Sequence, residues 1–138
     1  MKTEVLERFI EKMSWIRKSS KGLAMTFNVL VKEKDNTFVA HCLELDIVAT
    51  ADTVNQVKKD IISLIIAQID YAFSNDNLEN LFHSAPSEVW SEFFSCKEKI
   101  EERHKLKSFY KKDTTAKGIV PPPWIITNTC EAANLYYA

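Results

Sequence analysis

The first eighteen or so residues combine apolar and charged side chains with the period of a helix. The apolar positions are Val5, Phe9, Ile10, Met13 and Ile16. Spacings of three and four residues place such positions on one side of a helix, while the charged residues between them face water. Ser19, Ser20 and Gly22 then end the pattern. The sequence therefore predicts an amphipathic helix over residues 1–20.

From Leu23 onward the apolar positions recur at every second residue, which is the period of a strand with one buried face. The inward set is Met25, Phe27, Val29 and Val31. A turn signal over residues 34–36, Lys-Asp-Asn, separates this strand from a second alternating segment over residues 37–43. The two segments predict a β-hairpin, and the β-branched run over residues 47–50 predicts a third strand.

The residues from Val54 to Phe73 predict a long helix with a wide apolar surface. Thr53 and Gln56 form a capping-box pair at its start, in which each side chain reaches an unpaired backbone N–H of the other residue. The apolar positions are Val57, Ile61, Ile62, Leu64, Ile65, Ile69, Ala72 and Phe73. They cover more than one stripe, so the helix needs burial on two sides. The sheet covers one side, which leaves the other for the N-terminal helix, the C-terminal half or a second copy.

The C-terminal half begins with a polar break over residues 74–77. Pro86 suits the first turn of a further helix, and Trp90, Phe93 and Ile100 continue it at helical spacing. Beyond Cys96 this helix is highly charged up to residue 112. Gly118 and three prolines at 121–123 then stop helix formation.

The residues after the prolines predict an extended tail. Its first residues, Trp124, Ile125 and Ile126, are apolar. Such a segment suits the addition of a strand to a sheet, or packing across a neighbouring subunit. Folding of the tail back onto its own domain fits the pattern equally well.

These elements predict one α+β domain over residues 1–138. It comprises an N-terminal helix (1–20), a βββα core (24–73), a helical extension (74–112) and a proline-containing extended tail (113–138). The expected fold is a small antiparallel three- to four-stranded sheet packed on a long helix, with an N-terminal helix and a C-terminal helix plus extended tail. The expected surface for self-association or a partner consists of Ile62, Ile65, Ile69, Trp124 and Ile126.

Composition fits an ordinary globular protein and indicates no particular partner. Hydrophobic residues make up 46% of the chain and charged residues 27%, and a formal net charge of -1 creates no overall field toward nucleic acid or an anionic membrane. The longest apolar run, from Ile61 to Ala67, is broken by Ser63 and is far shorter than the roughly 20 residues of a membrane-spanning helix. We therefore expect no membrane span.

The cysteines and the N-terminal charges indicate the cellular compartment in which the protein is found. The charged N-terminal segment lacks the uninterrupted apolar stretch of a secretion signal. Cys42, Cys96 and Cys130 are an odd number of cysteines without CxxC spacing, which is typical of reduced thiols. We therefore expect a cytoplasmic protein without a structural disulfide.

The sequence predicts no catalytic, cofactor-binding or metal-binding residue. His41 and Cys42 are adjacent in a predicted strand, so they point to opposite faces and do not chelate one ion together. The chain has two glycines and neither a nucleophile elbow nor a phosphate-binding loop.

A small metal-dependent nuclease or hydrolase is an alternative, because four carboxylates lie at strand ends or turns, where a divalent metal gathers such groups. They are Asp35, Glu44, Asp46 and Asp52. Turn formation and helix capping explain these residues more simply.

The charged run over residues 97–112 holds seven Lys or Arg residues against three Glu. Lys105, Lys107 and Lys111, with Phe109 and Tyr110 among them, are the candidate contacts to a phosphate backbone. A solvated helix face also explains the run, since its glutamates pair with bases three or four residues away.

The hairpin, the third strand and the start of the long helix together resemble the HicB-like antitoxin domain. The segments that carry the resemblance are Phe27-Asn-Val-Leu-Val31, Thr37-Phe-Val-Ala-His-Cys-Leu-Glu-Leu45 and Ala51-Asp-Thr-Val-Asn-Gln-Val57. In that family an aromatic-Val-Ala strand leads through a Glu-Leu turn to a Gly-Asp-Thr helix start. The match covers roughly residues 24–73.

The resemblance implies a small sheet backed by a helix, related to a degenerate ribonuclease H fold without its active site, and a dimer or tetramer. In toxin–antitoxin pairs such a domain neutralises an RNA-cleaving HicA toxin, and a following DNA-binding segment recognises the operator. Here Ala51 replaces the usual Gly, and the segment after Ile100 ends in a proline-rich tail with no second helix pair. The chain looks more like stand-alone, uncharacterised relatives of HicB, and no catalytic residue carries over.

Together these observations favour a non-catalytic HicB-like binding protein. We expect it to form a homo-oligomer and to bind a protein partner such as a HicA-like toxin. A DNA-binding transcriptional autoregulator of a toxin–antitoxin type operon, which uses the basic run, is the alternative.

Overall fold

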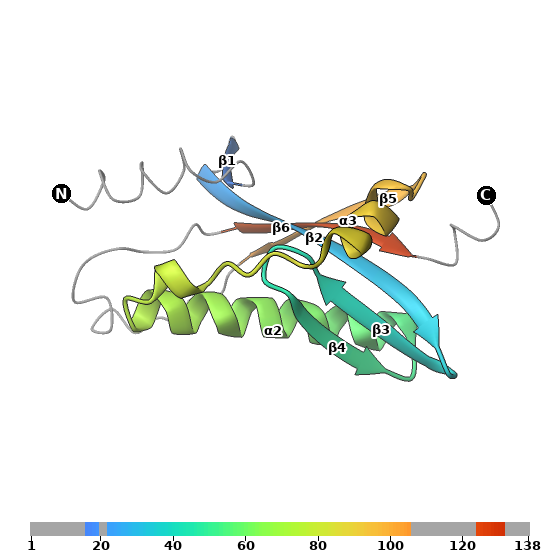
Figure 1. The fold of residues 1–138 in the computed structure, drawn as a ribbon. Coiled ribbons are helices and arrows are strands. Elements are labelled where there is room, and N and C mark those ends of the chain that lie inside the picture. Colours follow the sequence, from blue (N-terminus) through green and yellow to red (C-terminus); the bar gives the residue numbers. More distant parts are fainter. Residues whose placement is uncertain (1–15, 20–21, 106–123, 132–138) are drawn as a thin grey trace.

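The computed structural model describes residues 16–19, 22–105 and 124–131, and Figure 1 shows how they are arranged. The elements in chain order are β1 (Ile16–Ser19), β2 (Gly22–Lys34), β3 (Thr37–Cys42), β4 (Ile47–Ala51), α2 (Val54–Ser74), the short 3-10 helix η1 (Leu78–Asn80), α3 (Ser87–Phe94), β5 (Lys99–Lys105) and β6 (Trp124–Glu131). No helix in these described ranges combines the length and the apolar character that crossing a membrane requires.

A mixed sheet organises the described chain. Its strand order is β4-β3-β2-β6-β5, and β1 pairs with β2 off this path. The strand pairs are antiparallel except for β2 and β6, which run parallel from Ala24 opposite Trp124 to Val31 opposite Glu131. The last described strand, β6, therefore lies inside the sheet, between the longest strand β2 and the edge strand β5.

The predicted hairpin and third strand are confirmed as β2, β3 and β4. Asp35 and Asn36 form the turn between β2 and β3, with φ of 52° and 64°. Short polar side chains that bond locally tolerate this left-handed backbone better than others do, and it matches the twist of the flanking strands. Local sequence therefore fixes the hairpin.

The predicted long helix is confirmed as α2, and it starts at the predicted cap. Thr53 has an extended backbone, and its Oγ1 accepts a hydrogen bond from the backbone N–H of Gln56 at 3.1 Å. The Gln56 side chain does not return the bond but donates to Asp60 Oδ1 at 2.8 Å. Half of the capping box is thus present.

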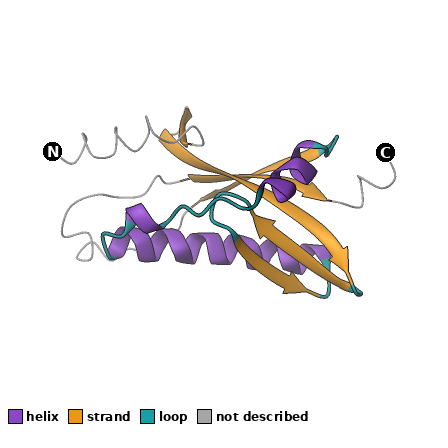
Figure 2. Ribbon diagram, in the orientation of Figure 1, coloured by secondary structure: helices purple, strands orange, loops and turns teal. Residues whose placement is uncertain are grey.

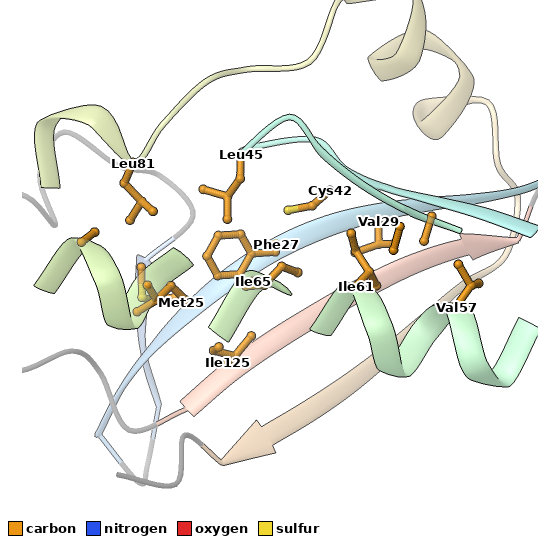
Figure 3. Close-up of a cluster of buried hydrophobic side chains, with 14 of the residues drawn as sticks. Met25, Phe27, Val29, Cys42, Leu45, Val57, Ile61, Ile65, Leu81 and Ile125 are labelled. Carbon is orange, nitrogen blue, oxygen red and sulfur yellow. The ribbon is translucent and has the colours of Figure 1, made fainter. Parts of the chain in front are cut away.

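The main core lies between α2 and one face of the sheet (Figure 3). The predicted inward set of β2 is buried here, together with Ile125 of β6. From α2 the buried residues are Val57, Ile61, Ile65, Ile69 and Ala72. Because β6 widens the sheet beside β2, the sheet covers more of the helix than three strands would.

A smaller core lies on the opposite face of the sheet, under α3. Its buried residues are Leu30, Leu43, Ala85, Phe93, Cys96 and Cys130. The described elements therefore form three layers, with α2 and α3 on opposite sides of the sheet, as Figure 2 shows.

The expected fold class is wrong. The sheet is mixed and larger than a three- to four-stranded antiparallel sheet, because β5 and β6 extend it beyond β2. The predicted C-terminal helix ends at Phe94, Lys99–Lys105 form a strand, and the predicted tail supplies β6. The charged β5 segment suits a solvated helix as well as an edge strand, and pairing with β6 decides between them.

The predicted N-terminal helix has no support in the described residues. Ile16–Ser19, which the predicted helix over residues 1–20 included, form β1 and pair with the start of β2. Residues 1–15 lie outside the described residues.

The expectation of three reduced thiols is also wrong. A disulfide joins Cys96 and Cys130, whose Cα atoms are 6.0 Å apart, and Cys42 is a buried free cysteine. The bond links the segment after α3 to β6. The pairing depends on β6 lying beside β2, which the spacing of the cysteines along the chain does not reveal.

Candidate functional site

The residues predicted to form a self-association surface are mostly core residues. Ile65 and Ile69 are fully buried, and Ile126 is 2% exposed. Ile62 is half-buried beside β5, and Trp124 is half-buried at the start of β6. These five side chains therefore do not form one exposed surface, because the sheet is wide enough to cover the helix that was expected to need a partner.

The predicted basic helix is a strand in its described part. Lys105 is exposed at the end of β5, whereas Lys107 and Lys111 lie outside the described residues. Neighbouring residues of a strand point to opposite faces, so Arg103 and Lys105 lie on the face opposite Glu102. The basic residues of Lys99–Lys105 therefore lie on a strand, and the predicted basic helix face is not formed by these residues.

The turn carboxylates serve local structure and do not converge. Asp35 and Asp46 occupy turn positions with φ of 52° and 53°. Asp46 Oδ1 also lies 2.6 Å from His41 Nε2, and Asp52 is exposed just before the cap of α2. Within the described ranges, no three His, Cys, Asp or Glu side chains are grouped so that they could hold a metal ion.

Glu44 is a buried carboxylate held by Asn28. Its side chain accepts two hydrogen bonds, from Asn28 N to Oε1 at 2.8 Å and from Asn28 Nδ2 to Oε2 at 2.6 Å. Asn128 Nδ2 lies 3.5 Å from Asn28 Oδ1, which extends the cluster to β6. Burial raises the pKa of Glu44 to about 7, and the hydrogen bonds from Asn28 act in the opposite direction. The protein itself thus engages both carboxylate oxygens.

His41 and Cys42 lie on opposite faces of β3, as the sequence predicted. Cys42 belongs to the core beneath α2, and burial raises the pKa of its thiol far above the usual range. His41 contacts Asp46 instead. The two side chains therefore serve packing and a turn contact respectively.

A groove of about 610 Å³ runs between α2 and β5. The residues that line it are Asn55, Lys58, Lys59, Ile62, Ser63, Glu102 and His104. Most of these side chains are polar, and they come from the N-terminal half of the helix and from one edge strand.

Lys58 is the central cation of this groove. Its Nζ lies 3.0 Å from Glu102 Oε1 and 3.6 Å from Glu131 Oε1, so it joins α2 to both β5 and β6. Glu102 Oε1 receives no bond with hydrogen-bond geometry among the described residues, so this contact is an ion pair by distance. His104 Nε2 lies 3.2 Å from Thr127 Oγ1, and burial lowers the pKa of His104. The Lys58 contacts therefore join α2 to β5 and β6, and the His104 contact joins β5 to β6.

The two edge strands of the sheet path differ in charge. Five of the seven β5 residues are charged, whereas the β4 sequence Ile-Val-Ala-Thr-Ala has no charged residue, glycine or proline. Among the described strands, β4 pairs only with β3, and β5 only with β6. Charges on an edge strand discourage the addition of another strand. Of the two edge strands in the described part of the chain, β4 is therefore the one whose sequence suits strand addition.

Three exposed apolar side chains lie on β4 and α2. Val48 is 49% exposed on β4, and Leu64 and Tyr71 are 40% and 59% exposed on α2. The sequence placed Leu64 among the apolar helix positions but assigned it to no surface. The helical period shows that Leu64 and Tyr71 lie on the same side of the helix. Which side of the helix the sheet covers is revealed only by the tertiary structure.

Comparisons with models of protein families, with curated proteins and with solved structures return no match for this chain.

Proposed function

We propose that this chain is a non-catalytic binding protein that holds an extended segment of a protein partner along β4. The observation that carries the proposal is the contrast between the uncharged edge strand β4 and the highly charged edge strand β5. An edge strand presents unpaired N–H and C=O groups to which a second strand adds, and main-chain hydrogen bonds supply the affinity of such complexes. Val48 and Thr50 are exposed on β4 and offer side-chain contacts to the added strand.

The proposal includes an antitoxin-like role. The resemblance to the HicB-like domain spans roughly residues 24–73, and β4 lies within it. The proposed partner is accordingly a small RNA-cleaving toxin of the HicA type, which a neighbouring small basic reading frame would encode.

The proposed role places the protein in the cytoplasm. Disulfides persist mainly in oxidising compartments, so the Cys96–Cys130 bond argues against this location. Because Cys96 and Cys130 are buried in the folded chain, cells are denatured directly in an alkylating reagent to distinguish the two compartments. Labelling of Cys96 supports the cytoplasm, and protection of both cysteines supports an oxidising compartment.

Selection from a library of displayed peptides against the full chain tests strand addition. We expect the selected peptides to be extended and rich in β-branched residues, and to slow amide hydrogen exchange in β4. Val48→Lys places a charge on the open edge, so it weakens peptide binding at least tenfold. Calorimetric titration measures the affinity.

The matched control is Ile100→Lys, which adds the same charge to β5 at a side chain that is 42% exposed. This variant keeps the affinity of the unmodified chain. Protection of β5 in place of β4, or equal losses in the two variants, overturns the proposal, as does a selection that yields no peptide.

A further inference from the structure

The groove between α2 and β5 has a row of unpaired polar groups on its helix wall. Asn55, Lys59 and Ser63 line the groove at four-residue spacings, which places them on one side of the helix. All three residues are exposed, and within the described part of the chain none of their side chains takes part in a hydrogen bond or an ion pair. The helix wall therefore offers donors that a bound molecule can use.

The charges of the groove leave one cation uncompensated. Its lining residues include two lysines and a single carboxylate, Glu102. Lys58 engages this carboxylate at 3.0 Å, and its Nζ also lies 3.6 Å from Glu131 Oε1 of β6. Lys59 has no such partner among the described residues. A free ammonium group beside amide and hydroxyl donors favours an anionic ligand, because hydrogen bonds between charged groups are the stronger ones.

The rest of the groove suits a flat, uncharged body. Ile62 is half-buried and lies three residues from Lys59, so the two are neighbours on the helix surface. His104 lines the opposite wall, and burial lowers its pKa, so its imidazole is uncharged at neutral pH. The volume of about 610 Å³ lies within the range of roughly 300–1,000 Å³ that small-molecule sites occupy.

We propose that this groove binds a small organic anion, a phosphate or carboxylate attached to a flat ring. The anionic group lies at Lys59 and Asn55, and the ring lies against Ile62. The Lys58–Glu102 ion pair stays intact, because the anionic contacts use side chains that the described fold leaves unpaired. The site borders β5, at the opposite edge of the sheet path from β4, and does not depend on strand addition there.

NMR titration of the full chain with three small probes tests the proposal. The probes are phenyl phosphate, benzoate and phenol, which share the ring and differ in the anionic group. We expect saturable shifts in the amide signals of Asn55, Lys59 and Ser63 with at least one of the two anions. The tighter of the two identifies the preferred anionic group. Phenol lacks the charge and binds at least tenfold more weakly than this anion.

Two substitutions separate the charge from the space. Lys59→Met removes the charge but keeps the unbranched stem, so it weakens binding about tenfold, as expected for the loss of a hydrogen bond to a charged group. Ser63→Trp fills the groove from an exposed helix position and removes saturable binding of both anions. Lys97→Met is the matched control, because Lys97 is exposed after α3 and does not line the groove. This variant keeps the affinity of the unmodified chain.

Three results overturn the proposal. The first is the absence of saturable shifts with both anions at millimolar concentration. The second is equal affinity for phenol and for the anions, which shows that the charge has no part in binding. The third is an equal loss in Lys59→Met and Lys97→Met, which indicates general attraction to lysines. Because the probes are not peptides, these results are independent of the outcome of peptide selection at β4.

Discussion

At the scale of single residues, Glu44 has the most perturbed environment among the described carboxylates. Its side chain is 8% exposed, and two donors of one residue, Asn28, hold its oxygens. Burial disfavours the charged form more than these hydrogen bonds favour it, so the pKa rises to about 7. Folding therefore takes up a proton at this site between the pKa of the unfolded chain and that of the folded chain.

Because of this proton uptake, the free energy of unfolding falls as the pH rises. The folded pKa of Glu44 is about 7 and the reference value is 4.5, so its contribution is complete below pH 4.5 and is lost as the pH rises through 7. At about 1.4 kcal/mol for each pKa unit, the difference between the two values corresponds to a loss on the order of 3 kcal/mol. Urea denaturation at a series of pH values measures it.

Glu44→Gln removes the titration while keeping the shape of the side chain. We expect the free energy of unfolding of this variant to fall less than that of the unmodified chain between pH 5 and pH 8. Glu92→Gln is the control, because Glu92 is a half-buried carboxylate on α3. In this variant the free energy of unfolding keeps the pH dependence of the unmodified chain. An identical slope in the Glu44 variant and the unmodified chain shows that another group governs this pH range.

At the scale of elements, α2 depends on its cap and on its contacts with three strands. Thr53 satisfies one of the unpaired N–H groups at the start of the helix, and Lys58 ties the first turns to β5 and β6. The open edge β4 directly precedes this helix. The cap therefore stabilises the element that adjoins the proposed binding edge.

Loss of the cap should destabilise the chain by about 1 kcal/mol, the usual cost of replacing a capping threonine with alanine. Thr53→Ala is the informative change, because it deletes the Oγ1 acceptor of the 3.1 Å bond from Gln56 N. Thr53→Ser keeps that acceptor and should retain nearly full stability. Urea denaturation measures both variants, and equal losses in the two would indicate that the methyl group, not the hydroxyl, matters.

At the scale of the whole molecule, the disulfide joins the segment after α3 to the interior strand β6. Cys96 and Cys130 are 34 residues apart in sequence, and both are buried under α3. A cross-link that closes a loop of this length reduces the conformational entropy of the unfolded chain. The bond therefore helps to keep the last described strand in its place between β2 and β5.

Reduction should lower the free energy of unfolding by roughly 3–4 kcal/mol, as expected for a loop of this length. The paired variant Cys96→Ser with Cys130→Ser should unfold like the reduced chain and should not respond to a reducing agent. Cys42→Ser is the control, because this free cysteine takes no part in the bond. Thermal unfolding with and without reductant measures the effect, and a transition that reductant leaves unchanged contradicts it.

The candidate surfaces were only partly predictable. The sequence shows that β4 is uncharged and that Leu64 and Tyr71 share a helix side. It does not show that β4 is an edge, because that depends on which strands lie beside it. Ile65 and Ile69 were assigned to an exposed surface because the expected sheet was too narrow to cover them, whereas in the structure they are fully buried.

The sequence alone determined the elements whose defining contacts are local. The β2–β3 hairpin follows from alternation around the Asp35–Asn36 turn, and the start of α2 follows from Thr53. The tertiary structure decided the rest, because β6 pairs in parallel with β2 across about one hundred residues of chain. That pairing widens the sheet, so the sheet buries the helix side that was expected to bind a partner. It also provides the strand with which the charged segment 99–105 pairs, and it brings Cys130 close to Cys96. No local pattern encodes contacts between segments so far apart, so only the folded chain reveals them.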